Sequence, residues 1–349
     1  MSRPQRATDA LVDGYEAVIC DLDGVVYRGP AAVPEAVPAL RRLVADGLRI
    51  TYATNNASRL PADVVGQLRH LGAPAPDGCV VTSAEAGAAR MRRSVAKGAE
   101  VVALGGPGLR AALAEELLVP VPAQQPRAAG VLQGYGPDLR VADFAEAARH
   151  VSSGVPWVAT NADTTLPVEW GIAPGNGAYV DVLRKATGRE PVVVGKPHAP
   201  LYELAMVRLG TRSVLAVGDR LDTDIDGARA AGIPSAWVLT GVDRPSDLVG
   251  SPDRAVPTFV LRGLHDLEVP YAAPVPVGGG WACGDVSVRL HVDADQVSLV
   301  LGSPGMSGDG SAVAVVRAGL AALLEARDAA LAPVASLAAA ATSLDALLD

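Results

Sequence analysis

The sequence contains few cysteines, no excess of basic residues and no long apolar run. Among its 349 residues are three cysteines, Cys20, Cys79 and Cys283, which are odd in number and far apart. This usage predicts reduced thiols, not a disulfide framework. Lys and Arg total 30 against 38 Asp and Glu, giving a formal net charge of −8. That balance argues against nucleic acid or an anionic membrane as the main partner.

Targeting and membrane signals are also missing from the sequence. No uninterrupted apolar stretch approaches the roughly 20 residues that cross a bilayer, so we expect no membrane insertion. The N-terminal residues 1–6 are not followed by the apolar segment of a secretory signal, which predicts a cytoplasmic protein. The length is sufficient for two or three domains.

The most informative feature that is present is an acidic pair behind an apolar run. Residues 17–20 (Ala-Val-Ile-Cys) predict a short buried strand, and Asp21 and Asp23 follow in the turn that ends it. In open α/β sheets, ligands bind outside the carboxyl ends of the strands. Two carboxylates placed there indicate a cation or a shared proton. An Asx turn is the alternative explanation.

Three further polar clusters stand where predicted strands end. They are Thr54-Asn55-Asn56, Lys196 after the apolar run 192–194, and Asp219 with Asp222 and Asp224 after the strand 213–218. Small hydroxyl and amide groups suit phosphate oxygens, and a lysine can neutralise a carboxylate and a phosphoryl group. The alternatives are a helix N-cap at Ser58, an exposed solubilising lysine, and acids that favour a helix N-terminus. Helical patterns at 34–46 and 61–71 alternate with these strands and predict a doubly wound parallel sheet.

In this order, the segments DLDGVVY, TNN, GKP and GDRLDTDI resemble the four motifs of the haloacid dehalogenase-like hydrolases, in their nitrophenylphosphatase, phosphoglycolate and pyridoxal-phosphate phosphatase branch. The resemblance runs from about Ala17 to Val269. It implies an α/β fold with a Rossmann-like core and a phosphatase that acts through an aspartyl-phosphate. Asp21 would be the nucleophile and Asp23 the general acid and base.

The same resemblance assigns the other motif residues. Mg²⁺ would bind the Asp21 carboxylate, the Asp23 carbonyl oxygen and the Asp219 carboxylate, with Asp224 in the outer shell. Thr54, Asn55 and Asn56 would bind the phosphoryl group, and Lys196 would balance its charge and orient Asp21.

The resemblance also predicts the domain organisation. Residues 1–82 and 191–269 would form the core, and the insertion 83–190 an α/β cap that closes over the site. Asn161, Asp163 and Asn176 lie in segments that face the substrate in the family, although turn chemistry explains these residue types equally well. Residues 270–349 would form a linker, 270–276, and a small α+β appendage. Bacterial members with such an appendage include glycerol-3-phosphate phosphatases, in which it resembles a degenerate acetyltransferase. We expect a structural or interaction role for it.

The sequence therefore predicts a Mg²⁺-dependent phosphatase for a small phosphorylated metabolite, with glycerol 3-phosphate as the expected substrate. The alternatives are 2-phosphoglycolate, a sugar phosphate or a nucleotide. A phosphotransferase or phosphomutase on the same core and a catalytically silent binding protein are further alternatives. A homodimer stays open, because one sequence does not determine the oligomeric state.

Overall fold

The computed structural model describes residues 9–168, 170–293, 296–302 and 309–348. The chain forms two compact units. The first comprises Met1–Leu48, Ser213–Arg229 and Ile233–Asp349, and the second Arg49–Arg212 with Ala230–Gly232. Among the described residues, no helix has both the length and the apolar character needed to cross a membrane.

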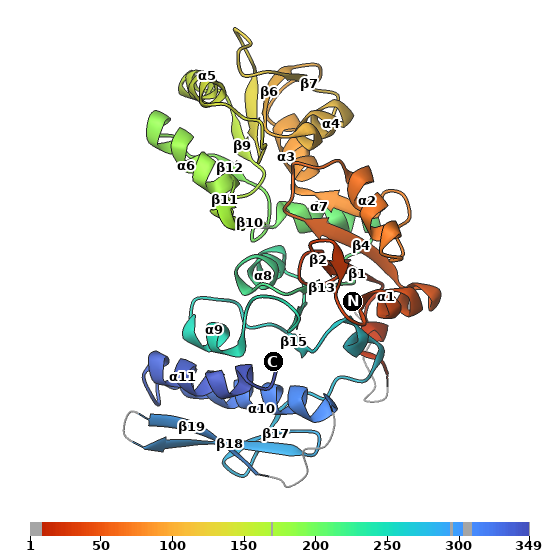
Figure 1. The fold of residues 1–349 in the computed structure, drawn as a ribbon, viewed down its shortest axis with the longest axis vertical. Helices are drawn as coiled ribbons and strands as arrows, with labels where there is room; N and C mark the ends of the chain where they lie inside the picture. The colour runs from red at the N-terminus through yellow and green to blue at the C-terminus, as the bar shows by residue number, and fades with distance from the viewer. Residues whose placement is uncertain (1–8, 169, 294–295, 303–308, 349) are drawn as a thin grey trace. The chain divides into compact units, whose positions relative to one another are not determined.

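The first unit contains four parallel strands in the order β15-β14-β13-β1. Strands β1, β13 and β14 are buried at every position and are apolar except for Ser235, as expected of strands covered on both faces. Short helices connect them, as Figure 1 shows. The elements are η1 (Leu11–Gly14), β1 (Ala17–Cys20), β2 (Tyr27–Arg28), β3 (Ala31–Ala32), α1 (Ala36–Ala45), β13 (Val214–Gly218), the π turn η2 (Leu221–Ile225), α8 (Asp226–Ala231), β14 (Ser235–Val238), α9 (Pro245–Gly250), β15 (Phe259–Leu261) and η3 (Leu264–Glu268).

The second unit begins with the parallel pair β4 (Arg49–Thr54) and β5 (Val80–Thr82). It also contains a second parallel sheet with the strand order β12-β9-β8-β6-β7. A cluster that includes Val102, Val131 and Trp157 forms the core of this sheet. The remaining elements are α2 (Pro61–His70), α3 (Ser83–Arg92), β6 (Glu100–Leu104), α4 (Pro107–Glu115), β7 (Val119–Val121), β8 (Gly130–Gln133), α5 (Val141–Ser152), β9 (Trp157–Ala159), the hairpin β10 (Thr165–Val168) and β11 (Gly171–Pro174), α6 (Asn176–Thr187), β12 (Val192–Val193) and α7 (Pro200–Leu209).

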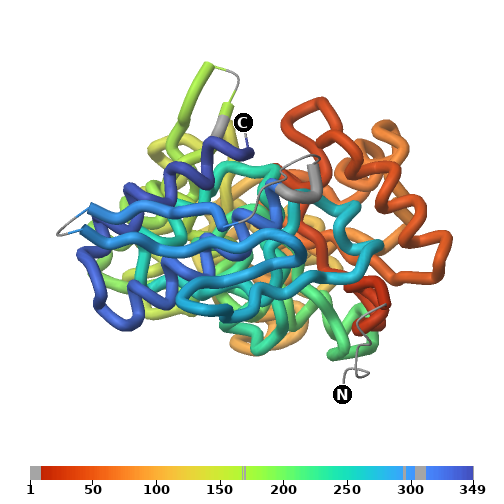
Figure 2. Tube along the Cα trace, turned by 90° about the horizontal axis from the view of Figure 1, so that it is seen from below, coloured from red at the N-terminus to blue at the C-terminus, as the bar shows by residue number. Residues whose placement is uncertain are grey.

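The C-terminal segment belongs to the first unit and forms an antiparallel sheet with two helices. Figure 2 shows its strands side by side in blue. They are β16 (Val275–Val277), β17 (Gly280–Cys283), β18 (Val286–Asp293) and β19 (Gln296–Leu301), followed by α10 (Asp309–Asp328) and α11 (Val334–Asp345). One hydrophobic cluster includes Val316, Leu323 and Leu344 of these helices together with Trp237 and Leu248 of the parallel sheet region. The segment therefore shares a core with the parallel sheet region.

The α/β class with parallel Rossmann-like sheets is confirmed, and so are most predicted strands and helices. One local prediction was wrong: residues 275–276 of the expected linker lie in strand β16, which pairs with β17. A second finding concerns β12, which pairs with β9 of the five-stranded sheet although it follows the boundary predicted at residue 190. The division into core, cap and appendage remains a prediction.

Candidate active site

In the first unit, two parallel neighbouring strands deliver acids at the same edge of the sheet. β1 pairs with β13 in register from Ala17–Val214 to Cys20–Val217, so Asp21 and Asp219 follow strands that end together. The backbone N–H of Asp21 donates to the carbonyl oxygen of Val217 at 2.8 Å. This register explains how two acids almost 200 positions apart reach one place.

The backbone leaves room for the Asp219 carboxylate at two glycines. Gly24 has a φ of +81°, a backbone conformation that residues other than glycine rarely adopt. A Cβ at this position would also overlap the Asp219 carboxylate. A Cβ at Gly241 would overlap the same carboxylate. The backbone N–H of Val242 donates to Asp219 Oδ2 at 3.3 Å. Asp219 is therefore enclosed by main chain on two sides.

Three carboxylates gather at this edge. One oxygen from each of Asp21, Asp219 and Asp224 lies within 4.8 Å of the others, and both Asp219 and Asp224 are buried. Asp224 is held by the backbone N–H of Arg220, which donates to Oδ2 at 3.1 Å. Buried carboxylates at this spacing repel one another, and a divalent cation would offset the repulsion. Their hard oxygen donors fit Mg²⁺.

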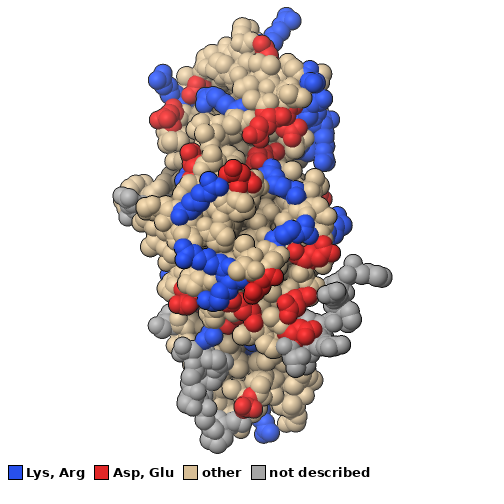
Figure 3. Space-filling view, turned by 90° about the vertical axis from the view of Figure 1, so that its right-hand side faces the viewer, with Lys and Arg blue, Asp and Glu red and all other residues tan. Residues whose placement is uncertain are grey.

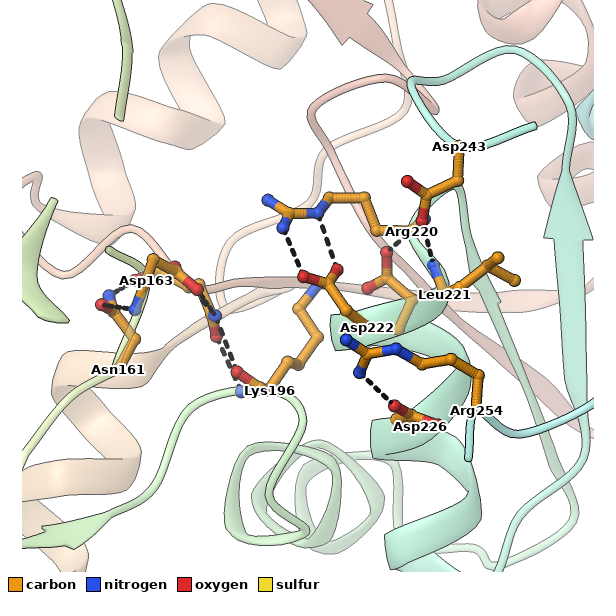
Figure 4. A network of polar contacts seen from close by, with 11 residues as sticks. Asn161, Asp163, Lys196, Arg220, Leu221, Asp222, Asp226, Asp243 and Arg254 are labelled. Atoms are coloured by element: carbon orange, nitrogen blue, oxygen red, sulfur yellow. Dashed lines mark hydrogen bonds and ion pairs between the residues drawn. The ribbon is translucent and has the colours of Figure 1, made fainter. Parts of the chain in front are cut away.

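The π turn that follows Asp219 is fixed by polar contacts, which Figure 4 shows from close by. Arg220 pairs with Asp222 through two hydrogen bonds of 2.7 and 3.0 Å. The Asp243 carboxylate accepts a hydrogen bond from the backbone N–H of Leu221 at 2.6 Å. Burial raises the pKa of Asp243, and this hydrogen bond opposes the rise. The turn is thus held at both of its first two residues.

Sequence reasoning missed the end of β14 and the segment that follows it. Trp237 donates its indole N–H to the carbonyl oxygen of Asp219 at 2.9 Å, and Thr240 donates its hydroxyl to the carbonyl oxygen of Gly24 at 2.8 Å. Together with Val242 and Asp243, these residues line the Asp219 loop. The signal was available, because an apolar strand that ends in Thr-Gly is the same pattern that marked the other strand ends.

In the second unit, Asn55 is the centre of the polar network. Its Oδ1 accepts the backbone N–H of Lys196 at 2.8 Å, and its Nδ2 donates to the carbonyl oxygen of Lys196 at 3.0 Å and to Asp163 Oδ2 at 3.2 Å. Its own carbonyl oxygen accepts hydrogen bonds from Ser83 and Asn161. The Asn55 side chain is therefore engaged by the protein, which leaves the predicted phosphate contact to the backbone.

Thr54, Asn56 and Lys196 lie around this centre. Thr54 is buried at the end of β4, and its hydroxyl accepts the backbone N–H of Asn56 at 3.0 Å while it can still donate one hydrogen bond. The Asn56 side chain accepts from the Ser58 backbone and hydroxyl. Lys196 is 3% exposed, and its Nζ donates to the Ala53 carbonyl oxygen at 3.1 Å. Burying an ammonium group is costly, which favours an anionic partner for it.

The three predicted cap residues differ in exposure. Asn161 and Asn176 are buried, and the Asn176 amide donates to the Asn161 carbonyl oxygen at 2.7 Å. Asn161 also accepts the backbone N–H of Asp163 at 3.3 Å. These contacts support the loop-shaping alternative for both asparagines. Asp163 is partly exposed, and a substrate-facing role for it remains a prediction.

The structure thus groups the predicted residues into two sets, one in each unit. The first contains Asp21, Asp219 and Asp224, with the exposed Asp23 two residues beyond Asp21. The second contains Thr54, Asn55, Asn56, Lys196, Asn161, Asp163 and Asn176. The first set suits a divalent cation, and the second combines a buried lysine with hydroxyl and amide groups. Together the two sets contain residue types that suit metal binding, acid–base chemistry and phosphoryl binding.

Two family models match the chain. A haloacid dehalogenase-like hydrolase model matches residues 18–117, and a HAD-hydrolase-like model matches residues 193–267. The first match includes Asp21 and the Thr54 cluster, and the second includes Lys196, Asp219 and Asp224. The first set and the Thr54 cluster with Lys196 therefore lie within the matched segments, whereas Asn161, Asp163 and Asn176 lie between them.

Similar proteins extend the match to almost the whole chain. The D-glycerol 3-phosphate phosphatase of Mycobacterium tuberculosis is 39% identical over 92% of this chain and 89% of its own length. A crystal structure of glycerol phosphate phosphatase from Mycobacterium tuberculosis in complex with magnesium has a TM-score of 0.80 and 36% identity, covering 93% of this chain and 94% of that one. The p-nitrophenyl phosphatase of Archaeoglobus fulgidus has a TM-score of 0.67 and 30% identity, covering 72% of this chain and 98% of its own.

Proposed function

The chain belongs to the haloacid dehalogenase-like hydrolases and is a phosphoric monoester hydrolase, and we propose that it hydrolyses glycerol 3-phosphate to glycerol and phosphate. One observation carries the proposal. The similarity to the D-glycerol 3-phosphate phosphatase spans 92% of this chain, and therefore includes much of the region beyond the catalytic motifs.

Asp21 is the proposed nucleophile. Its carboxylate follows a buried strand and lies at the edge of the sheet where the acids gather. Attack on phosphorus forms an Asp21 acyl phosphate as the bond to the glycerol oxygen breaks. Asp23, which is exposed two residues later, would protonate the departing oxygen and then take a proton from the attacking water.

Thr54 and Lys196 are the proposed phosphoryl-binding groups. The Thr54 hydroxyl can donate to a phosphoryl oxygen, and the buried Lys196 ammonium would balance the charge of a phosphoryl group. We assign Asn55 and Asn56 to the same loop, where they can offer backbone N–H groups.

Mg²⁺ is the proposed cofactor, in keeping with the magnesium complex of the similar glycerol phosphate phosphatase. The Asp21 and Asp219 carboxylates and the Asp23 carbonyl oxygen would hold it, with Asp224 in its outer shell. When bound, the ion offsets the negative charge of the phosphoryl group and of these acids.

The experiment that tests this function measures released phosphate across a panel of esters. The panel contains glycerol 3-phosphate, 2-phosphoglycolate, sugar phosphates, a nucleotide and an aryl phosphate, each with Mg²⁺ or with excess chelator. We expect the highest kcat/KM for glycerol 3-phosphate and no turnover with chelator. A higher kcat/KM for a different ester would show that glycerol 3-phosphate is not the preferred substrate. Full activity in chelator would show that the enzyme does not require Mg²⁺.

The cap residue Asp163 is proposed to read the glycerol hydroxyls. A site that hydrogen-bonds a substrate hydroxyl discriminates against ligands that lack it. Asp163→Ala should therefore lower kcat/KM for glycerol 3-phosphate more than for an aryl phosphate. An equal fall in kcat/KM for both substrates would show instead that Asp163 acts mainly through its hydrogen bond with Asn55.

A further inference from the structure

The C-terminal segment contacts the region of the first unit that carries the Asp219 loop. Residues of α10 and α11 share one hydrophobic cluster with Leu221 and Ile225 of the π turn, Trp237 of β14 and Leu248 of α9. Because protein interiors are close-packed, a displacement on one side of such a cluster is transmitted to the other. The segment and the Asp219 loop are therefore mechanically connected.

Trp237 forms the first connection. Its ring is fully buried in that cluster, and its indole N–H donates to the backbone carbonyl oxygen of Asp219 at 2.9 Å. The main chain of Asp219 is thus fixed by a side chain whose position depends on the shared core.

Helix α9 forms the second connection. Asp345 of α11 accepts hydrogen bonds from the backbone N–H and hydroxyl of Ser246 at 3.1 and 2.6 Å, close to the start of α9. Asp243, three residues before Ser246, accepts a hydrogen bond from the backbone N–H of Leu221. Val242, one residue earlier, donates its backbone N–H to the Asp219 carboxylate. Ser246, which contacts α11, therefore lies only a few residues from the two residues that contact the Asp219 loop.

We propose that the C-terminal segment braces the metal-binding loop, with Trp237 and Ser246 as positioning residues that fix Asp219 through the shared core and through α9. This inference rests on the proposed metal site and assigns a role to the C-terminal segment. It predicts that changes far from the carboxylates weaken Mg²⁺ binding without altering any ligand.

The test measures Mg²⁺ binding to the full chain by titration calorimetry, well below the melting temperature. Trp237→Phe keeps an aromatic ring but removes the N–H that holds Asp219. Loss of one such hydrogen bond corresponds to roughly a fivefold weaker Mg²⁺ affinity. Asp345→Ala should weaken it about twofold, since it acts through α9 alone.

Two matched variants serve as controls. Trp281→Phe keeps an aromatic ring against the same cluster but removes an indole N–H that donates to Glu325 at 2.7 Å and not to the Asp219 loop. Leu113→Ala lowers stability in the core of the second unit, because Leu113 is fully buried in α4. Both should bind Mg²⁺ as the wild type does.

The outcomes separate the inference from the proposed function. Weaker Mg²⁺ binding in Trp237→Phe and Asp345→Ala, with both controls unchanged, supports the brace. If both variants bind Mg²⁺ with wild-type affinity and have a lowered melting temperature, the inference is overturned, and Trp237 contributes only to the packing of the core. Absence of Mg²⁺ binding in the wild type overturns the proposed metal site itself. Asp345→Ala alters a partly exposed side chain, so it remains informative if Trp237→Phe fails to fold.

Discussion

At the scale of single residues, the Asn55 carboxamide joins three loops. It holds both the backbone N–H and the carbonyl oxygen of Lys196, and it donates to Asp163. A side chain used in this way positions other groups. Its importance for turnover should therefore come from the geometry that it imposes on Lys196.

Asn55→Ala should lower kcat for an aryl phosphate by about 100-fold, because small displacements of catalytic groups cost about that much. Asn55→Asp should lower kcat by at least the same factor. It keeps an acceptor for Lys196 but places a second carboxylate beside Asp163. Steady-state kinetics with a melting temperature for each variant provide the measurement. A kcat within twofold of wild type for Asn55→Ala would remove the positioning role.

Cys79 gives a pH-dependent prediction. Burial raises the pKa of its thiol to about 11, and burial also raises the pKa of Cys283. The thiolate is the reactive form, so the native protein should react slowly with Ellman's reagent at pH 8, and all three thiols should react after denaturation. Between about pH 8.5 and 11, the unfolded chain loses the Cys79 proton that the folded chain keeps, so the free energy of unfolding should fall. Rapid reaction of three thiols in the native protein would contradict this account.

At the scale of elements, the end strand of the parallel sheet in the first unit is covered by the C-terminal segment. The backbone N–H of Val260 in β15 donates to the Tyr271 hydroxyl at 3.3 Å, and its carbonyl oxygen accepts from Arg317 Nε at 2.7 Å. Arg317 also lies over the Tyr271 ring, 4.2 Å from its centroid, and pairs with the buried Asp266. An uncovered strand edge is a template for aggregation, and these two side chains occupy it.

Arg317→Met should therefore lower the free energy of unfolding by about 3 kcal/mol, since it leaves a buried carboxylate and a backbone carbonyl without this partner. Chemical denaturation measures the effect. Arg149→Met is the matched control, because it also removes an ion pair, with Glu146, and hydrogen bonds to the backbone carbonyls of Gln125 and Pro126, but at the surface. It should change stability by less than about 1 kcal/mol. Equal effects of the two substitutions would show that Arg317 does not secure the edge.

The elements were predictable from sequence where apolar runs end in acids, amides or glycine. Strands β1, β4 and β13 and the acids behind two of them follow directly from that pattern. The pairing of β12 with β9 was not predictable, because an apolar run of three residues does not specify its neighbour. The roles of Asn161 and Asn176 were equally open, since loop-shaping and ligand-facing asparagines look alike in a sequence.

At the scale of the whole molecule, one sequence does not specify which surface covers the apolar side of α10. The structure shows that this surface includes both the C-terminal sheet and residues near the Asp219 loop. Long-range packing of this kind depends on tertiary contacts, and one sequence contains no periodic signal for it. Basic and acidic side chains are interspersed on the face drawn in Figure 3.

The central claim is that Asp21 attacks the phosphorus of glycerol 3-phosphate, and trapping the intermediate tests it most directly. The wild-type enzyme is mixed with glycerol 3-phosphate and Mg²⁺, quenched within milliseconds and treated with borohydride, which reduces an acyl phosphate to an alcohol. Peptide mass spectrometry should then find homoserine at position 21, and Asp21→Asn, which is nearly isosteric, should give neither homoserine nor released phosphate. Phosphate release by the wild type with homoserine at a different acid, or continued turnover by Asp21→Asn, would contradict the account.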